Sequence, residues 1–238
     1  MSATVSTLWY VDAPDPAAVL REFAPDRDAA QALLSRLFPD LQVDPGVRVP
    51  LTEVGGTDGP GTAGEDGVER FWVGSYPGVT VVSSHRFALR HPSELPAMWL
   101  RTPAAQRTCL LASDPGGAWG SFAVWECGRL RRSFGANTVE FFEDEGLPFV
   151  WERPFWAGEH PLRWPPNIPP PPESLPFHPR KLVEEAHGAW LGFRYVGRRA
   201  DEPDPREIET WSFTLRTPVP QITVPEPKTG WWRRLVAR

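Results

Sequence analysis

The chain has 238 residues, is 41% hydrophobic and 12% aromatic, and carries a net charge of −5. Twelve tryptophans and thirteen phenylalanines can form a sizeable core, which excludes a wholly disordered chain and fits one domain with appendages. Residues 217–238 hold four basic residues and one acidic residue, so this segment is +3 and the remainder is −8. An acidic body argues against nucleic acid as a partner, because phosphate contacts need clustered lysine and arginine.

The sequence also indicates a compartment. The N-terminus lacks the basic and apolar regions of a signal peptide, and no run approaches the roughly 18 apolar residues of a membrane span. With only Cys109 and Cys127, the chain cannot build a disulfide framework or a four-cysteine zinc site. We therefore expect a cytoplasmic protein with two reduced thiols and no cofactor.

The first quarter of the chain predicts a strand, a helix and a loop. Residues 4–11 are rich in β-branched and aromatic side chains and predict a strand. Apolar residues at helical spacing predict a helix near residues 30–38, capped by Asp26 or Asp28 and stopped by Pro39. The glycine-rich residues 55–67 predict a flexible loop, and no helix N-terminus follows them to bind a phosphate.

The next segments predict further short elements. Strands are expected at residues 69–75 and 79–83, joined by a turn at Pro77 and Gly78. Ser93 is expected to cap a short helix that runs through Trp99. Residues 107–112 predict another strand.

Residues 119–134 predict a β-hairpin with a two-residue loop at Cys127 and Gly128, where glycine supplies the positive φ that such a loop needs. That loop fixes a register of facing pairs. The expected pairs are Glu126 with Arg129, Trp125 with Leu130, and Val124 with Arg131.

The second half predicts a strand at residues 138–142 and an acidic turn at 143–146. Residues 161–179 contain nine prolines and are expected to be an extended connector without internal hydrogen bonds, or else a ligand for a partner. A helix from Pro179 and a last strand at 211–216 follow. The expected fold is α+β: a mainly antiparallel β-sheet with two to four packed helices in a single compact domain, residues 1–216.

Residues 217–238 are expected to be a proline-rich linker and a basic aromatic tail. Wound as a helix, the end of this tail would place tryptophans on one side and arginines mostly on the other. We expect it to dock on a protein partner through an acidic groove, or on an anionic membrane surface. The docking residues are Trp231, Trp232, Arg233 and Arg234.

Several motifs together resemble a family. They are Phe122-Ala-Val-Trp-Glu-Cys-Gly-Arg-Leu-Arg-Arg-Ser133, Gly146-Leu-Pro-Phe149, Pro154-Phe-Trp-Ala-Gly-Glu-His-Pro161 and Leu175-Pro-Phe-His-Pro179, with Arg36-Leu-Phe-Pro39 and Gly74-Ser-Tyr-Pro-Gly-Val79 earlier. In this order they resemble an uncharacterised family of actinobacterial proteins of unknown function, over roughly residues 4–216. The family usually has a shorter link where this chain has its proline run. The resemblance implies a compact cytoplasmic protein and no reaction.

Residues 147–160 are the best candidate binding surface, because they concentrate aromatics, prolines and charges without strand or helix periodicity. We expect Glu152 and Arg153 to form a charged pair, and the body of His160 to pack against Trp156. Tryptophan and arginine are frequent anchors of protein interfaces. The predicted binding residues here are Trp151, Arg153, Trp156, Glu159 and His160.

The function expected from these features is a non-enzymatic binding or adaptor module with a protein partner. The alternative is a hydrolase or a metal-dependent enzyme that uses His160, His178 and Glu159. Glu184 and His187, three residues apart on the predicted helix, have the spacing of a helix-borne metal site. No segment has the Gly-x-Ser-x-Gly spacing of a serine hydrolase. A third interpretation, an acidic inhibitor of a basic toxin or nuclease, depends only on the charge of the body.

Overall fold

Strand β1 (Val5–Val11) shows how the sequence builds a sheet that is buried on both faces. Successive side chains of a strand point to opposite faces. Leu8 and Tyr10 therefore enter one apolar cluster, and Trp9 and Val11 enter the other. The computed structural model describes residues 5–54, 68–101, 105–114, 116, 118–164, 167 and 169–218.

All described strands form one antiparallel sheet in the order β2-β9-β3-β4-β1-β5-β6-β7-β8. The remaining strand bounds are β2 (Gln42–Pro50), β3 (Glu69–Tyr76), β4 (Val79–Ser83), β5 (Arg107–Asp114), β6 (Trp119–Glu126), β7 (Arg129–Ala136), β8 (Phe141–Glu145) and β9 (Glu209–Arg216). The helices are α1 (Pro16–Glu22), α2 (Arg27–Leu37), α3 (Met98–Arg101), α4 (Arg153–Trp156) and α5 (Pro179–Leu191). Short 3₁₀ turns η1 (Leu51–Glu53), η2 (His85–Phe87), η3 (Pro92–Glu94) and η4 (Val150–Glu152) complete the elements.

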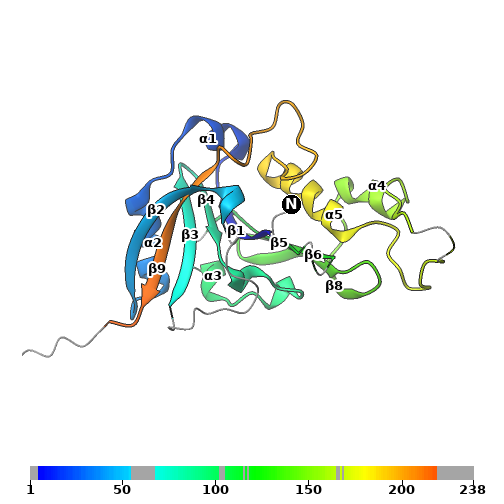
Figure 1. Cartoon of the computed structure of the whole chain (residues 1–238), viewed down its shortest axis with the longest axis horizontal. Helices are drawn as coiled ribbons and strands as arrows, with labels where there is room; N and C mark the ends of the chain where they lie inside the picture. Colours follow the sequence, from blue (N-terminus) through cyan, green and yellow to red (C-terminus); the bar gives the residue numbers. More distant parts are fainter. Residues whose placement is uncertain are drawn as a thin grey trace, which may run out of the picture.

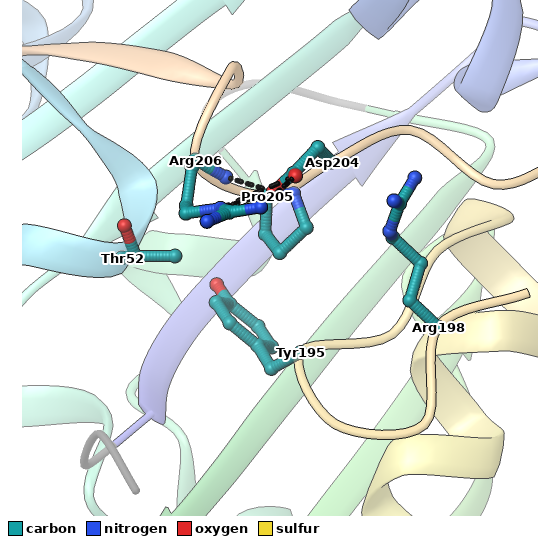
Figure 2. A pocket seen from close by; sticks show the side chains of 6 residues that line it. All are labelled: Thr52, Tyr195, Arg198, Asp204, Pro205 and Arg206. Carbon is teal, nitrogen blue, oxygen red and sulfur yellow. Dashed lines mark hydrogen bonds and ion pairs between the residues drawn. The ribbon is translucent and has the colours of Figure 1, made fainter. Parts of the chain in front are cut away.

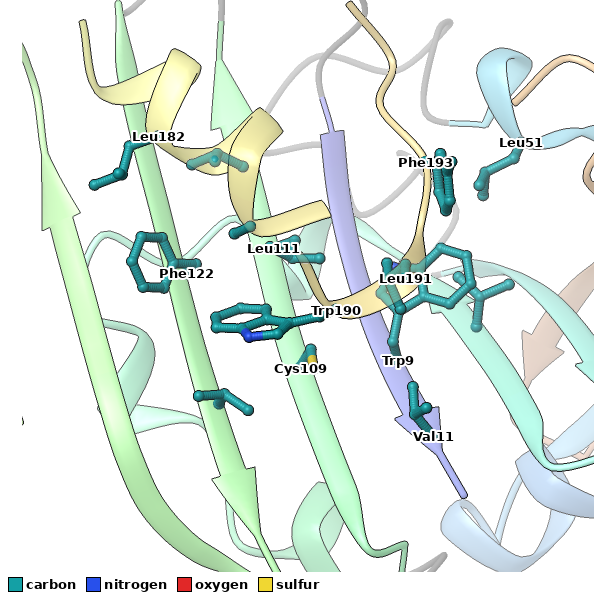
Figure 3. Packing of buried hydrophobic residues seen from close by; sticks show 14 of the residues in the cluster. Trp9, Val11, Leu51, Cys109, Leu111, Phe122, Leu182, Trp190, Leu191 and Phe193 are labelled. Carbon is teal, nitrogen blue, oxygen red and sulfur yellow. The ribbon is translucent and has the colours of Figure 1, made fainter. Parts of the chain in front are cut away.

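Helix α5 covers one face of the sheet, above β5 and β6 (Figure 1). Its buried side chains, among them Leu182 and Trp190, pack on Phe122 of β6 and on the strands beside it (Figure 3). Gly120 allows this close approach, since a Cβ there would lie 2.9 Å from Val183 of the helix. Helix α2 packs against β2, β3 and β9, where its residues Leu33, Leu34 and Leu37 join the second cluster.

The structure confirms an α+β fold with an antiparallel sheet in one compact domain. The expectation was two to four helices, and the described residues hold five, of which α3 and α4 are four-residue turns. Asp26 is the cap of α2, accepting from the backbone N–H groups of Asp28 and Ala29. No helix in the described ranges has the length and apolarity needed to cross a bilayer.

The 119–134 hairpin is confirmed with one correction. Cys127 and Gly128 both have positive φ, at 49° and 75°, as a type I′ loop requires. Glu126 faces Arg129 and Trp125 faces Leu130, but Val124 faces Arg132 rather than Arg131. The register shift between Val124 and Trp125 is a β-bulge, and a bulge re-aims the side chains beyond it.

Other local expectations were wrong. Ser93 caps no helix: it lies inside η3, and its hydroxyl bonds the Glu143 carboxylate at 3.0 Å. The acidic residues 143–145 belong to strand β8 rather than to a turn. The proline-rich segment contains internal hydrogen bonds, because the Leu162 N–H donates to the Pro176 carbonyl at 3.0 Å.

Candidate functional site

The irregular segment that follows β8 is fastened by an ion pair inside the protein. Arg132 of β7 and Glu152 of η4 are both 0% exposed, and the guanidinium Nη2 lies 3.0 Å from Glu152 Oε2. Arg132 also pairs with Asp144 of β8, and its Nη1 donates to the Glu145 carbonyl at 3.0 Å. Burial lowers the pKa of Arg132, whereas the hydrogen bonds and charges of Glu152 and Asp144 raise this pKa by a larger amount. The net shift of the pKa is therefore upward. The guanidinium therefore stays charged.

Glu152 connects this pair to the aromatic side chains. Its Oε1 accepts from the Phe149 backbone N–H at 3.0 Å, and its Oε2 accepts from the Trp156 indole N–H at 3.3 Å. The expected pairing of Glu152 with Arg153 is wrong, because the Glu152 carboxylate pairs with the buried guanidinium of Arg132 on β7. Arg153 is exposed.

Phe149, Trp151 and Trp156 of this segment are each partly buried against the core and partly exposed to solvent. Trp151 stacks on Phe149, with ring centroids 6.1 Å apart, and meets Trp190 edge-on. Trp156 stacks on Phe141 of β8 at an interplanar angle of 9° and meets Phe177 edge-on. Trp151 and Trp156 are each partly buried against the first cluster. They therefore support the core and also form part of its rim.

The other predicted residues of the segment are spread along α4 and beyond it. Glu159 is exposed. His160 is half-buried and stacks on Phe155, with centroids 4.2 Å apart, so the expected packing on Trp156 is wrong. Trp231, Trp232, Arg233 and Arg234 lie outside the described residues, as does the glycine-rich loop 55–67.

Exposed apolar side chains concentrate beside this segment. Of the eight large hydrophobic residues exposed in the described ranges, four fall between residues 139 and 150. They are Val139 at 39%, Phe141 at 44%, Leu147 at 88% and Val150 at 72% exposure. These four residues with Trp156 are called the β8–α4 surface below. Phe141 stacks on Trp156, and exposed apolar groups that form a patch are typical of interaction sites.

The residues named for an enzyme have other partners. His178 caps α5, where its Nδ1 accepts from the Arg180 backbone N–H at 3.3 Å. Glu184 accepts from the backbone N–H groups of Tyr195 and Val196, at 2.8 and 3.2 Å. Across the described ranges, no three His, Cys, Asp or Glu residues are grouped as metal ligands would be.

His187 is buried in α5, and its Nε2 has no hydrogen-bond partner among the described residues. Its Nδ1 lies 3.0 Å from the Val183 carbonyl, which can only accept, so Nδ1 carries the proton and Nε2 keeps a lone pair. Burial, with a smaller contribution from Arg194, lowers the pKa of His187 to about 4 despite the bond to Val183. The imidazole is neutral at pH 7.

Arg194 follows α5 and crosses its surface at Gly188. A Cβ on Gly188 would lie 2.4 Å from the guanidinium carbon, so the bare glycine makes room for it. Arg194 pairs with Glu185 at 2.6 Å and also with Glu202. These contacts tie the loop that runs from α5 to β9 onto the helix.

That loop forms one wall of a pocket of about 210 Å³. Tyr195, Arg198 and the segment 204–206 line it on one side, and Thr52 of η1 lines it on the other (Figure 2). Arg206 and Asp204 form an ion pair with a nitrogen–oxygen distance of 2.6 Å. Hydrogen bonds from Arg206 lower the pKa of Asp204 to about 2, so this pair stays ionised at neutral pH.

Sequence reasoning missed two of these features. Arg132 is one of three nearby arginines, Arg129, Arg131 and Arg132, and only the bulge selects which one turns inward. The pocket had a weak signal in the alternating charges and prolines of residues 198–206. Such a composition also describes an ordinary solvated loop, so it does not identify a pocket by itself.

Comparison with known proteins identifies a family but no activity. No curated protein and no solved structure matches this chain. The model of DUF6928, described as a family of unknown function, matches residues 5–213. This range covers most of the chain and ends in β9, so the chain belongs to that family of unknown function.

Proposed function

We propose that the protein is a non-enzymatic, cytoplasmic binding or adaptor module that docks a protein partner on the β8–α4 surface. The observation that carries this proposal is the exposure of Leu147 and Val150, 88% and 72%, in the same segment as the half-buried Trp156, which stacks on the exposed Phe141. Binding of a partner would remove the apolar surface of these side chains from water, which stabilises the complex by about 25 cal/mol per Å² of apolar surface buried. Aromatic anchors beside them are characteristic of interface centres.

The charges near this surface indicate the chemistry of the partner. Glu140 and Glu145 are exposed near Phe141 in the chain, whereas the exposed Asp144 is already paired with Arg132. Strand β8 is an edge of the sheet, and charged residues on an edge strand oppose the addition of another strand. We therefore propose a partner that binds through side chains, presenting apolar residues flanked by lysine or arginine.

The test uses charge substitutions at exposed positions. Leu147→Asp and Val150→Asp should leave the free energy of unfolding nearly unchanged, since both side chains lie largely in solvent. Val47→Asp is the matched control, because Val47 is 67% exposed but lies on β2 at the opposite edge. Capture of a partner from host lysate should be lost in the first two variants and kept in the third. Equal capture by all three would reject the surface.

The C-terminal tail is proposed as a second docking element. Its two adjacent tryptophans and three arginines suit an acidic protein groove or an anionic membrane surface. Deletion of residues 230–238 should reduce co-sedimentation with anionic vesicles or association with host proteins. If neither association changes, the tail is not a docking element.

A further inference from the structure

We infer that the pocket between η1 and the loop after α5 binds a small ligand bearing an oxyanion, a phosphate or a carboxylate, through Arg198 and Tyr195. The pocket lies at a different place in the fold from the β8–α4 surface. Thr52, Tyr195, Arg198, Asp204, Pro205 and Arg206 line it.

The charges of the described residues that line the pocket leave one unpaired cation, Arg198. Arg206 is neutralised by Asp204, with hydrogen bonds from Nε and Nη2 to both carboxylate oxygens. Among the described residues Arg198 has no carboxylate within ion-pair distance, and the Asp204 carboxylate attracts it only from further away. One of its five N–H donors, on Nη1, reaches the Glu202 backbone carbonyl at 3.0 Å. The pocket therefore carries a net charge of +1, with guanidinium donors available to an anion.

Tyr195 adds a hydroxyl group whose position is fixed. Its backbone N–H donates to Glu184 at 2.8 Å, and its ring packs edge-on against His187 and Phe193, at 5.1 and 5.5 Å. The hydroxyl makes no hydrogen bond within the described ranges, and in Figure 2 it points to the side of Thr52 and Arg206. Burial raises the pKa of this phenol, so it remains a donor at any physiological pH.

The volume restricts the ligand. Pockets for drug-sized molecules begin at about 300 Å³, and this pocket measures about 210 Å³. It suits a small molecule, or the anionic end of a larger one. The anion would meet the Arg198 guanidinium, and one of its oxygens would accept from the Tyr195 hydroxyl. Pro205 is buried and contributes an apolar wall.

The experiment titrates the full chain with inorganic phosphate and, separately, with acetate at constant ionic strength, followed by isothermal calorimetry and by NMR of arginine side-chain N–H groups. We expect saturable binding of at least one probe, and the stronger probe identifies the oxyanion. Arg198→Gln should weaken binding about tenfold or more, because it removes a charge-assisted donor. Tyr195→Phe should weaken it about fivefold, the equivalent of one neutral hydrogen bond.

Arg199→Gln is the matched control. Arg199 is the next residue and is exposed, but it does not line the pocket, so the substitution changes the net charge equally without removing a contact. Its binding constant should stay within twofold of the unsubstituted chain. Absence of saturable binding for both probes at millimolar concentration overturns the inference, as does an equal loss in Arg198→Gln and Arg199→Gln. Thermal unfolding of each variant verifies that the fold is intact.

Discussion

Substitution in the buried ion pair of Arg132 and Glu152 should destabilise the fold strongly. Glu152→Leu removes the acceptor for the Arg132 guanidinium, the Phe149 N–H and the Trp156 indole. The guanidinium is 0% exposed and would keep Asp144 as its remaining carboxylate partner. Removing one member of a buried pair costs about 3–5 kcal/mol, and we expect a loss of unfolding free energy of that size.

A double-mutant cycle separates the loss of the ion pair from a simple loss of packing. Arg132→Met alone should also cost about 3–5 kcal/mol, because it leaves the Glu152 carboxylate buried without its cation. The double variant Arg132→Met/Glu152→Leu removes both charges together, and apolar replacement of a whole buried pair is often close to neutral. We therefore expect the double variant to cost no more than either single variant, which corresponds to a coupling energy of about 3 kcal/mol or more.

Urea unfolding followed by tryptophan fluorescence and by circular dichroism measures these free energies. Arg131→Met is the matched control: Arg131 is the neighbouring residue, its side chain is 57% exposed, and it pairs with Glu126 on the surface. This control should cost less than about 1 kcal/mol. Additive effects in the double variant, or an equal cost for Arg131→Met and Arg132→Met, would refute the account of the buried pair.

Three further predictions concern the interior. Because the pKa of His187 is lowered to about 4 from 6.5, the folded chain should lose about 3 kcal/mol of stability as pH falls from 6.5 to 4. His187→Leu should flatten that part of the stability profile while His85→Leu, at an exposed position, leaves it unchanged; an unaltered profile in the first variant would contradict the assignment. Gly135→Ala would place a Cβ 2.0 Å from a backbone carbonyl oxygen and should cost about 1–3 kcal/mol in urea unfolding, whereas a neutral result would mean that the two segments separate easily. A thiol reagent should label Cys127 in the folded chain and Cys109 only after unfolding, since Cys109 is buried and burial raises its pKa to about 12; mass spectrometry of both labelled forms decides this.

Local sequence determined those elements whose signals agree with one another. The helix at α2 combines apolar spacing with a capping aspartate, and the structure uses that cap at Asp26. The same agreement holds at α5, where Gly192 takes φ 73° and ends the helix. The hairpin loop at Cys127 and Gly128 could likewise be predicted from the sequence. A type I′ turn requires positive φ, which glycine adopts easily.

Elements with conflicting local signals were missed. Strand β2 contains Pro45 and Pro50, which normally oppose a strand, and it is tolerated because it is an edge of the sheet with a register shift after Pro45. Helix α1 is only seven residues long and follows a proline-rich turn. The strand could not be predicted without knowing its neighbours, whereas α1 has start signals in the sequence, with Asp15 as its cap and Pro16 in its first turn.

Within the candidate site, the sequence by itself determined which residues are aromatic, acidic or basic, and it located the segment 147–160 as unusual. Only the tertiary structure decided which acidic residue forms an ion pair with which basic residue. Glu152 stands next to Arg153 in the chain, yet it pairs with Arg132, twenty residues earlier, because a bulge turns that arginine into the interior. A buried charge must find its partner within the interior wherever the chain places it, and sequence distance carries no information about that choice.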